Sequence, residues 1–268
     1  MSDEFSKIVN MQHSELGPVG VNGKHFIDFE PYLKTTNFAA LNQEALIGLS
    51  LVDKFDLSFV PGEIPPELRS QYGGMFLESE IMSQLEKFDP DQTHRNNMKN
   101  MSAQQRRRYC YLALGALSPW YGTCYLKRND FKNKTQNEPS WTENAQYFPQ
   151  IVEYIENMRG TIFSKIGRVL FFISYPLSSI VTHRDYLPIK HKDHCVNFYF
   201  SQGRPAYIYD EIQKKKFYLD PKCRAYFFNN RDYHGVDAEP AMRYTLRVDG
   251  TFQGNFAEKI GLKDGWVG

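Results

Sequence analysis

Short runs of apolar and aromatic residues, separated by turn residues, fill the chain after Gly167. The runs read RVLFFISYP, SIVTH, CVNFYFS, AYIYDE, KKFYLD, RAYFFNN and RYTLRVDGTF. β-Branched and aromatic side chains suit the pleated surface of a sheet, and such runs at short intervals indicate one strand after another. The pattern predicts a barrel or sandwich in the second part of the chain.

Helical spacing of apolar residues marks the first part of the chain. Residues 38–52 are rich in Ala and Leu, and Ser102 can cap a helix over AQQRRRYCYLALGAL. A later helix is predicted at Pro149, which would stand in its first turn or kink it. Its apolar positions recur at helical intervals: Phe148, Ile151, Ile155 and Met158.

These helices need a partner surface for their apolar stripes, and the predicted sheet is the obvious one. We therefore divide the chain into a mostly helical N-terminal region, residues 1–165, that packs on a β core, residues 166–268. A short strand is also expected over residues 25–29, and the two regions can share one core.

Composition narrows the class of protein. With 268 residues, 41% hydrophobic and 24% charged, the chain is typical of a soluble globular protein and not of a disordered one. A formal charge of +1 does not favour nucleic acid or an anionic membrane as a partner. The four cysteines form no close pair, the N-terminus lacks an apolar leader, and no uncharged apolar run reaches about 18 residues. We expect a cytoplasmic protein that is neither secreted nor membrane-spanning.

The sharpest chemical signal is His183-Arg184-Asp185, directly after the apolar run SSIVT. Residues two apart on a strand point to the same face, so His183 and Asp185 can offer an imidazole and a carboxylate to one ion. His234 follows the run RAYFFNN and is the candidate third ligand. Two histidines and one carboxylate form the facial triad of non-haem Fe(II) oxygenases, which leaves metal positions open for a co-substrate and O₂.

A cation is expected close to this site. Arg243 opens the run RYTLRVDGTF, and an arginine inside a barrel needs an anionic partner because an unpaired buried guanidinium is costly. A dicarboxylate co-substrate would supply that partner, since the planar guanidinium grips a carboxylate with two hydrogen bonds. Tyr199, in the run CVNFYFS, could donate its hydroxyl to the same carboxylate.

The order of these residues resembles the Fe(II)/2-oxoglutarate-dependent oxygenase superfamily: His-x-Asp, then Tyr, then His, then Arg. Residues 234–252 are similar to the prolyl hydroxylase branch. The run RYTLRVD, residues 243–249, also resembles the Arg-x-x-Leu-x-x-Asp strand of the aspartyl/asparaginyl and free-proline hydroxylase branch. The resemblance covers roughly residues 165–253 and says little about the N-terminal region.

The resemblance implies an α+β fold with a double-stranded β-helix (jelly-roll, cupin-like) core and flanking N-terminal helices. It implies that His183, Asp185 and His234 bind Fe(II), and that Arg243 and Tyr199 bind the distal carboxylate of 2-oxoglutarate. The implied reaction uses O₂, releases succinate and CO₂, and hydroxylates an amino acid or a residue of a protein. The primary substrate itself is not implied.

Arg247 lies four residues after Arg243 on the same predicted strand, so both should face the barrel interior. One arginine can hold the co-substrate, and we expect the other, Arg247, to meet a carboxylate of the primary substrate. The alternatives are a bulge that turns Arg247 outward, or pairing with a nearby acid such as Asp249.

Several other features have plainer interpretations. His191 and His194 lie in the charged loop IKHKDH and are expected to face solvent, with a zinc site as the alternative. The run Arg106–Arg108 is more typical of a solvated helix face than of a phosphate site. Core packing is favoured over substrate stacking for Trp120 and Tyr121, and a solvated hairpin tip for residues 214–216.

Two functions of different class remain open from the residues alone. The first is the oxygenase. The second is a cupin-like binding or assembly protein that keeps the barrel and performs no oxidation. Oxygenation of a nucleobase is a third possibility, but it would require a basic channel and stacking aromatics, which the near-neutral charge does not favour.

Overall fold

The computed structural model describes most of the chain in twelve stretches. They are residues 20–21, 23–33, 37–53, 55–58, 62–63, 92–101, 121–128, 139–174, 179–185, 194–200, 204–239 and 242–262. The helix predicted after Ser102, the arginine run inside it, His191 and Trp120 lie outside these residues.

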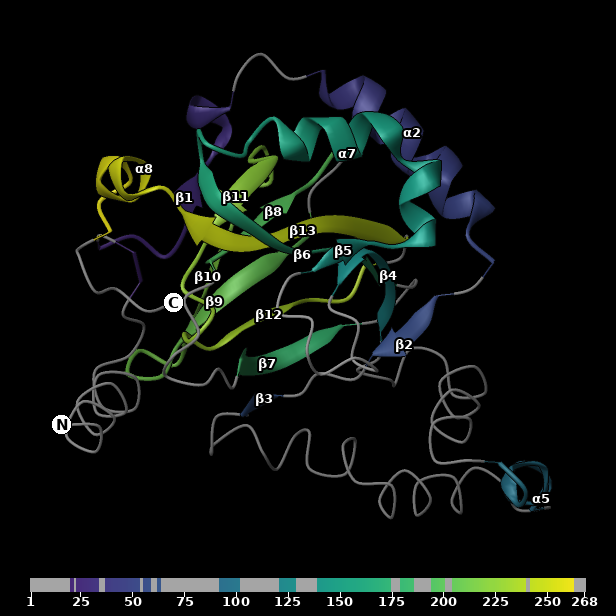
Figure 1. The fold of residues 1–268 in the computed structure, drawn as a ribbon. Coiled ribbons are helices and arrows are strands. Elements are labelled where there is room, and N and C mark those ends of the chain that lie inside the picture. The colour runs from purple at the N-terminus through teal and green to yellow at the C-terminus, as the bar shows by residue number, and fades with distance from the viewer. Residues whose placement is uncertain are drawn as a thin grey trace, which may run out of the picture.

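Two antiparallel sheets form the body of the fold (Figure 1). The larger sheet has the order β1 (Ile27–Asp28), β11 (Ala225–Phe227), β8 (His194–Phe198), β13 (Arg243–Phe252), β6 (Phe163–Ser174), β4 (Tyr121–Arg128), β2 (Asp56–Ser58), and β5 (Ser140–Trp141) pairs with β4. The smaller sheet has the order β10 (Lys215–Tyr218), β9 (Ala206–Asp210), β12 (His234–Val236), β7 (Ile180–Asp185), β3 (Gly62–Glu63). The strand-after-strand prediction for the second part of the chain is confirmed.

The chain crosses repeatedly between the two sheets after β6. Strands β6, β8, β11 and β13 belong to the larger sheet, and β7, β9, β10 and β12 to the smaller one. The long strand β13 pairs with both β6 and β8, so it occupies the middle of the larger sheet. Consecutive segments therefore lie on opposite walls of the molecule, and side chains distant in sequence meet between the walls.

Two helices cover the outer face of the larger sheet: α2 (Phe38–Leu51) and α7 (Pro149–Glu156) (Figure 1). Pro149 stands in the first turn of α7, where its missing N–H costs nothing. The other helical segments of the described residues are the 3₁₀ helices η1 (Glu30–Tyr32) and η4 (Glu143–Tyr147), and the short helices α5 (Thr93–Met98) and α8 (Gly254–Lys259). The helices predicted over residues 38–52 and at Pro149 are confirmed.

Alternation along β13 separates a dry core from the interior between the sheets. Tyr244, Leu246 and Val248 belong to the hydrophobic cluster under the helices, together with Ile151 of α7 and Phe38 of α2. The residues between them, Thr245, Arg247 and Asp249, face the other way because successive side chains of a strand point to opposite faces. The polar face of β13 is thus turned toward the smaller sheet.

The predicted boundary at residue 165 falls inside β6, which spans Phe163–Ser174. Strands from the N-terminal region, β1, β2, β4 and β5, hydrogen-bond into the larger sheet, and one hydrophobic cluster contains residues from both regions. The regions therefore share a core, as the sequence allowed, while their separation into two units stays a prediction.

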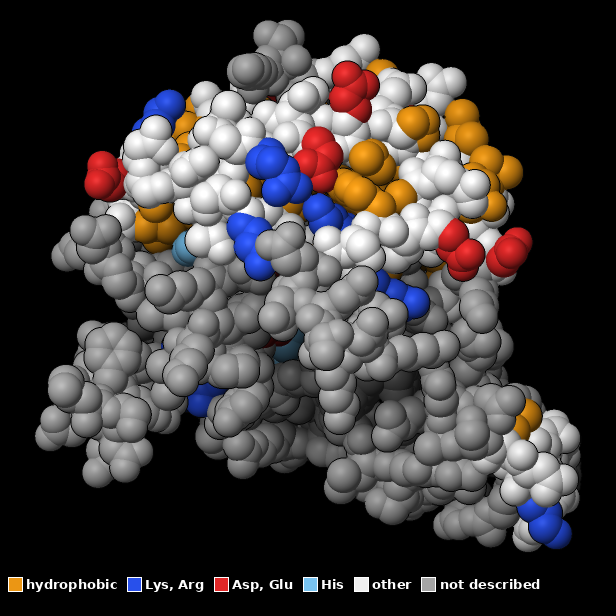
Figure 2. All heavy atoms as spheres, viewed as in Figure 1, with side chains coloured by type: hydrophobic (Ala, Val, Ile, Leu, Met, Phe, Trp, Pro, Cys, Tyr) orange, Lys and Arg blue, Asp and Glu red, His pale blue; other side chains and the backbone are white. Residues whose placement is uncertain are grey.

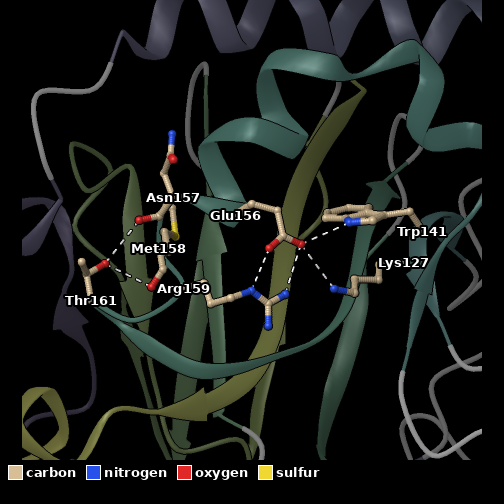
Figure 3. A network of polar contacts seen from close by, with 7 residues as sticks. All are labelled: Lys127, Trp141, Glu156, Asn157, Met158, Arg159 and Thr161. Atoms are coloured by element: carbon tan, nitrogen blue, oxygen red, sulfur yellow. Dashed lines mark hydrogen bonds and ion pairs between the residues drawn. The ribbon is translucent and has the colours of Figure 1, made fainter.

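An ionic and aromatic cluster fastens the end of α7 to the edge of the larger sheet (Figure 3). Glu156 accepts hydrogen bonds from Trp141 Nε1 at 3.1 Å, Arg159 Nε at 2.9 Å and Lys127 Nζ at 3.4 Å. Because Lys127 is buried and belongs to β4, this carboxylate joins α7 to β4 and β5.

A buried carboxylate joins α2 to α7. Glu44 Oε1 accepts from the backbone N–H of Gln150 at 2.8 Å, and Oε2 from that of Ile151 at 2.7 Å. The first N–H groups of a helix have no partner within the helix, and the positive end of its dipole favours an anion. Glu44 therefore supplies from α2 the cap that α7 does not receive from its own preceding side chain.

We predict that Glu44→Gln lowers the free energy of unfolding by about 1–3 kcal/mol, because the amide group offers one acceptor and no charge to the two N–H groups. Urea unfolding followed by circular dichroism measures the loss. Glu153→Gln, on the exposed face of α7, is the matched control and should change stability by less than about 0.5 kcal/mol. Equal losses in the two variants would contradict the capping role.

The surface shows apolar side chains over α2 (Figure 2). Leu46, Ile47 and Leu51 are each more than half exposed there. None of the described helices combines the length and the apolar character needed to cross a bilayer. Cys124, Cys195 and Cys223 are buried free thiols.

Candidate metal centre

Strands β7 and β12 of the smaller sheet bring the three predicted ligands together. His183 and Asp185 come from β7, and His234 opens β12 directly opposite His183. One ligand atom from each residue lies within 4.8 Å of the others. The imidazole centroids are 4.4 Å apart, and His183 Nε2 lies 3.6 Å from Asp185 Oδ1. Two imidazoles and a carboxylate therefore converge on one point.

The local sequence explains this convergence. His183 and Asp185 are two residues apart on one strand and share a face, and residues directly opposite on antiparallel strands hold their side chains close together. The pairing of His234 with both His183 and Ile208 fixes β12 between β7 and β9. All three ligands are thus held by hydrogen-bonded strands and not by a loop.

The ring of His234 is oriented by the turn before it. His234 Nδ1 lies 2.8 Å from the carbonyl oxygen of Asp232, and since a carbonyl only accepts, Nδ1 carries the proton and donates. The lone pair of Nε2 is then available to a metal, in the arrangement by which outer partners orient ligating histidines. Burial, with the neighbouring His183, lowers the pKa of His234 to about 3, so its imidazole is neutral near pH 7.

Asp185 is held in its ionised form. Burial alone would raise the pKa of this carboxyl, but the contact with His183 and the nearby His234 and Arg247 hold it well below its ordinary value. Arg247 Nη1 lies 3.6 Å from Asp185 Oδ2. A neutral imidazole and a carboxylate are the forms in which these side chains bind metals.

A cavity of about 80 Å³ lies beside the ligands, between the two sheets. A buried water needs about 10–15 Å³ on this scale, so the cavity has room for several waters, or for one small molecule in their place. His183, Asp185 and His234 line it from the smaller sheet, and polar side chains from the larger sheet complete it. Its remaining wall is mostly apolar and aromatic: Phe26, Phe172, Ile180, Ala206, Phe228 and Val236.

The structure does not bring Arg243 to this cavity. Its Nε donates to Glu239 Oε2 at 3.2 Å, and the side chain is partly exposed. Arg243 is the first residue of β13, so its side chain can turn at the strand end toward a carboxylate that lies four residues earlier. The guanidinium of Arg243 thus pairs with Glu239 and does not line this cavity, and its assignment to the co-substrate stays a prediction.

Arg247 does line the cavity, but it already has acidic partners. Its Nε donates to Asp249 Oδ1 at 2.6 Å, which is the alternative that the sequence left open. Asp249 Oδ2 in turn accepts from Arg168 Nε at 2.8 Å. These arginines outweigh the effect of burial and lower the pKa of Asp249. Arg168, Asp249, Arg247 and Asp185 thus form a row of alternating charge that ends at the candidate metal ligands.

Tyr199 stands one residue back from the cavity. It is fully buried, and its hydroxyl and that of Tyr226 are 2.9 Å apart. Tyr226 lines the cavity, whereas Tyr199 does not, so any contact of Tyr199 with a ligand would pass through Tyr226.

His194 is buried, contrary to the expectation that it faces solvent. It is the first residue of β8, and its ring stacks on Phe252 with centroids 4.3 Å apart. The charged residues around His194 suggested a loop, whereas strand β8 begins at His194 itself. The turn between β9 and β10 is formed by residues 211–214, so of the predicted hairpin tip only Lys214 lies in the turn, whereas Lys215 and Lys216 belong to β10.

Arg204, Asn197 and Tyr226 are among the cavity residues that sequence reasoning missed. Arg204 lies two residues before β9 and is 6% exposed, and its Nη1 donates to Ser174 Oγ. Asn197 lies in β8 opposite Arg247. The strand alternation of CVNFYFS could have placed Asn197 on the inner face, but Arg204 stands outside any strand run and carries no periodic signal.

Comparison with known proteins gives low-level structural similarity. No protein-family model matches the sequence, and no curated protein matches it. Among solved structures, EvdMO1 matches with a TM-score of 0.40 and 12% identity over 91% of this chain, which spans 49% of that protein. A 2OG-Fe(II) oxygenase family oxidoreductase from Burkholderia pseudomallei matches with a TM-score of 0.34 and 12% identity. The match covers 48% of this chain and 67% of that one.

A prolyl hydroxylase from Trichoplax adhaerens, solved with a hypoxia inducible factor peptide, matches with a TM-score of 0.32 and 12% identity, over 85% of this chain and 96% of that one. The chain is thus similar to solved 2OG-Fe(II) oxygenases and prolyl hydroxylases. At these TM-scores the similarity by itself decides neither the activity nor the substrate.

Proposed function

We propose that this protein is an Fe(II)- and 2-oxoglutarate-dependent oxygenase with a double-stranded β-helix core. The observation that carries the proposal is the convergence of His183, Asp185 and His234 on one point of an internal cavity. Two nitrogens and one carboxylate oxygen are the donor set of a facial triad, which keeps metal positions open for ligands. The crossing of the chain between two sheets supports the β-helix assignment.

The residues present fit Fe(II) on their own chemistry. The imidazole of His234 is held in the tautomer that leaves Nε2 available, and Asp185 is kept ionised beside Arg247. Bound at this site, Fe(II) with 2-oxoglutarate would activate O₂ and couple release of succinate and CO₂ to oxidation of a substrate C–H bond. The chain itself binds, orients and shields: the wall of Phe172, Phe228 and Val236 keeps bulk water from the ligands.

Hydroxylation of an amino acid or of a protein residue is the reaction we propose. The choice of hydroxylation rests on the resemblance of residues 234–252 to hydroxylase branches. The geometry of the site supports an oxygenase but does not specify this reaction. The competing function is a cupin-like binding or assembly protein with a metal but no oxidation. Consumption of O₂ with release of succinate is expected of the oxygenase and not of the binding protein.

Anaerobic titration with Fe(II) and then 2-oxoglutarate tests the proposal. The expected result is a weak visible charge-transfer band when both are present, and its absence in His234→Ala. Admitting O₂ should then release succinate. Folded wild-type protein that binds Fe(II) and shows no band would refute the oxygenase and favour the binding protein.

We predict that Arg247→Ala weakens binding of Fe(II) by about ten- to a hundredfold, because outer partners that orient a ligating carboxylate typically have effects of this size. Isothermal titration with Mn(II) or Co(II) measures the change, and Arg247→Lys should restore part of it. Metal affinity unchanged in Arg247→Ala, with weaker binding of the primary substrate, would return Arg247 to the substrate role predicted from the sequence.

A further inference from the structure

Arg204 brings a buried positive charge into the cavity. Its side chain is 6% exposed, and its Nη1 donates to Ser174 Oγ, a neutral acceptor. Its Nε has no hydrogen-bond partner, and no carboxylate among the described residues pairs with it. Arg204 therefore differs from Arg247, whose charge Asp249 and Asp185 balance.

A buried guanidinium without a counter-ion is costly, because it loses its hydration and gains no charge partner. A bound anionic ligand can supply the counter-ion that such a buried guanidinium lacks within the protein. The cavity is the space that Arg204 faces, so the missing anion is a ligand of that cavity.

Strand register places Arg204 and the metal ligands at different ends of the same cavity. Ile208 of β9 pairs with His234, and Ala206 pairs with Val236. Arg204 lies two residues before β9, where the chain turns at Pro205 and the N–H of Ala206 donates to the carbonyl oxygen of Arg204 at 2.7 Å. It therefore stands near the Val236 end of this row and not opposite His234. A ligand bound to the metal at one end and to Arg204 at the other must carry an acidic group at its far end.

Two further donors lie along this path. Asn197 Nδ2 is buried without a partner and lines the cavity. The Tyr226 hydroxyl lines it too, and when Tyr199 donates to Tyr226, the proton of Tyr226 is available to a ligand. Burial raises the pKa of Tyr226 well above its ordinary value, so this hydroxyl stays a donor.

We propose that Arg204, and not Arg243, binds the distal carboxylate of 2-oxoglutarate, with Tyr226 and Asn197 as accompanying donors. The inference rests on the proposed function for the identity of the ligand. The cross-strand partner of Arg243 on β6 is Ser174, the residue to which Arg204 donates. Arg204 thus lies beside Ser174 of β6, whereas the side chain of Arg243 pairs with Glu239.

Calorimetric titration of the anaerobic Fe(II) protein tests this assignment with two ligands, 2-oxoglutarate and 2-oxopentanoate. The second keeps the 2-oxo acid end and the five-carbon chain but lacks the distal carboxylate. Arg204→Gln should weaken 2-oxoglutarate binding by about ten- to a hundredfold and leave 2-oxopentanoate within about twofold. Arg204→Lys should be intermediate, since lysine keeps the charge and loses the planar fork. Arg243→Gln is the matched control and should bind both acids as wild type does.

Thermal unfolding without metal gives a second readout. Arg204→Gln removes an unbalanced buried charge, so the metal-free variant should be at least as stable as wild type. Succinate, which carries carboxylates and cannot turn over, should raise the midpoint of wild type and not that of Arg204→Gln.

Three results would overturn the inference. One is loss of 2-oxoglutarate affinity in Arg243→Gln with none in Arg204→Gln. Another is an equal loss for both acids in a destabilised Arg204→Gln, which would make Arg204 a structural residue only. The third is a wild-type midpoint that succinate leaves unchanged. If wild type binds neither 2-oxo acid at the metal yet succinate stabilises it through Arg204, the proposed function fails while the anion site stands.

Discussion

Asp185→Ala is expected to abolish Fe(II) binding and all iron-dependent turnover while the protein stays folded. The variant removes the only anionic member of the cluster formed with His183 and His234, so only the two imidazoles remain. The effect should exceed the ten- to hundredfold loss that follows removal of an outer partner of a ligand. Arg247 keeps Asp249 as its charge partner, which is why the fold should survive.

Metal content after anaerobic reconstitution, succinate release and circular dichroism together measure this outcome. Asp53→Ala, at an exposed carboxylate, is the matched control and should retain metal and turnover. His183→Ala and His234→Ala should behave as Asp185→Ala does. Undiminished iron-dependent turnover in Asp185→Ala would remove the carboxylate from the site and with it the facial triad.

The second large effect concerns stability. Asp249→Asn keeps the shape of the side chain but leaves Arg247 without its shortest ion pair, Nε to Oδ1 at 2.6 Å. Breaking a buried pair by neutralising one partner typically costs about 3–5 kcal/mol, because the other charge stays buried. Arg168 is 39% exposed and can turn to water, so most of the loss comes from Arg247.

Guanidinium unfolding of the metal-free proteins measures the difference. Asp237→Asn is the control: this carboxylate pairs with Lys216 at 2.6 Å, yet both side chains are about a third exposed, and surface pairs contribute about 1 kcal/mol or less. The low pKa of Asp249 means that its contribution is present above the unfolded pKa and is lost as the pH falls through the folded one. The difference in stability between wild type and Asp249→Asn should therefore begin to narrow below about pH 3.8, the ordinary pKa of Asp, and close only as the pH falls through the lower pKa of folded Asp249. A similar loss in both variants at pH 7 would contradict the buried role of Asp249.

The two-residue periodicity of strands was sufficient to predict the features that depend on local sequence alone. The apolar runs located the strands, and the two-residue repeat placed His183 and Asp185 on one face. It also placed Arg247 on the face of β13 that turns toward the smaller sheet. These features depend only on alternation within a strand, which the sequence carries directly.

The features that escaped prediction depend on contacts between distant segments. Arg243 has the same position in the two-residue repeat as Arg247. It lies at the end of the strand, however, and its side chain pairs with Glu239 in the preceding loop. His194 was assigned to a loop by its charged neighbours, yet the ring of Phe252 covers it. Arg204 gave no pattern at all, since its position is set by the pairing of β9 with β12. A single sequence does not show which of several arginines will meet a cavity.

The contact between Arg247 and Asp185 joins the two sheets, because Arg247 belongs to the larger sheet and Asp185 to the smaller one. The spacing of the two walls is thereby coupled to the electron density that Asp185 offers to a metal. Anything that forces the two sheets apart, such as an oversized ligand, lengthens this contact. The absorption spectrum of a bound Co(II) ion would thus report the spacing of the two sheets.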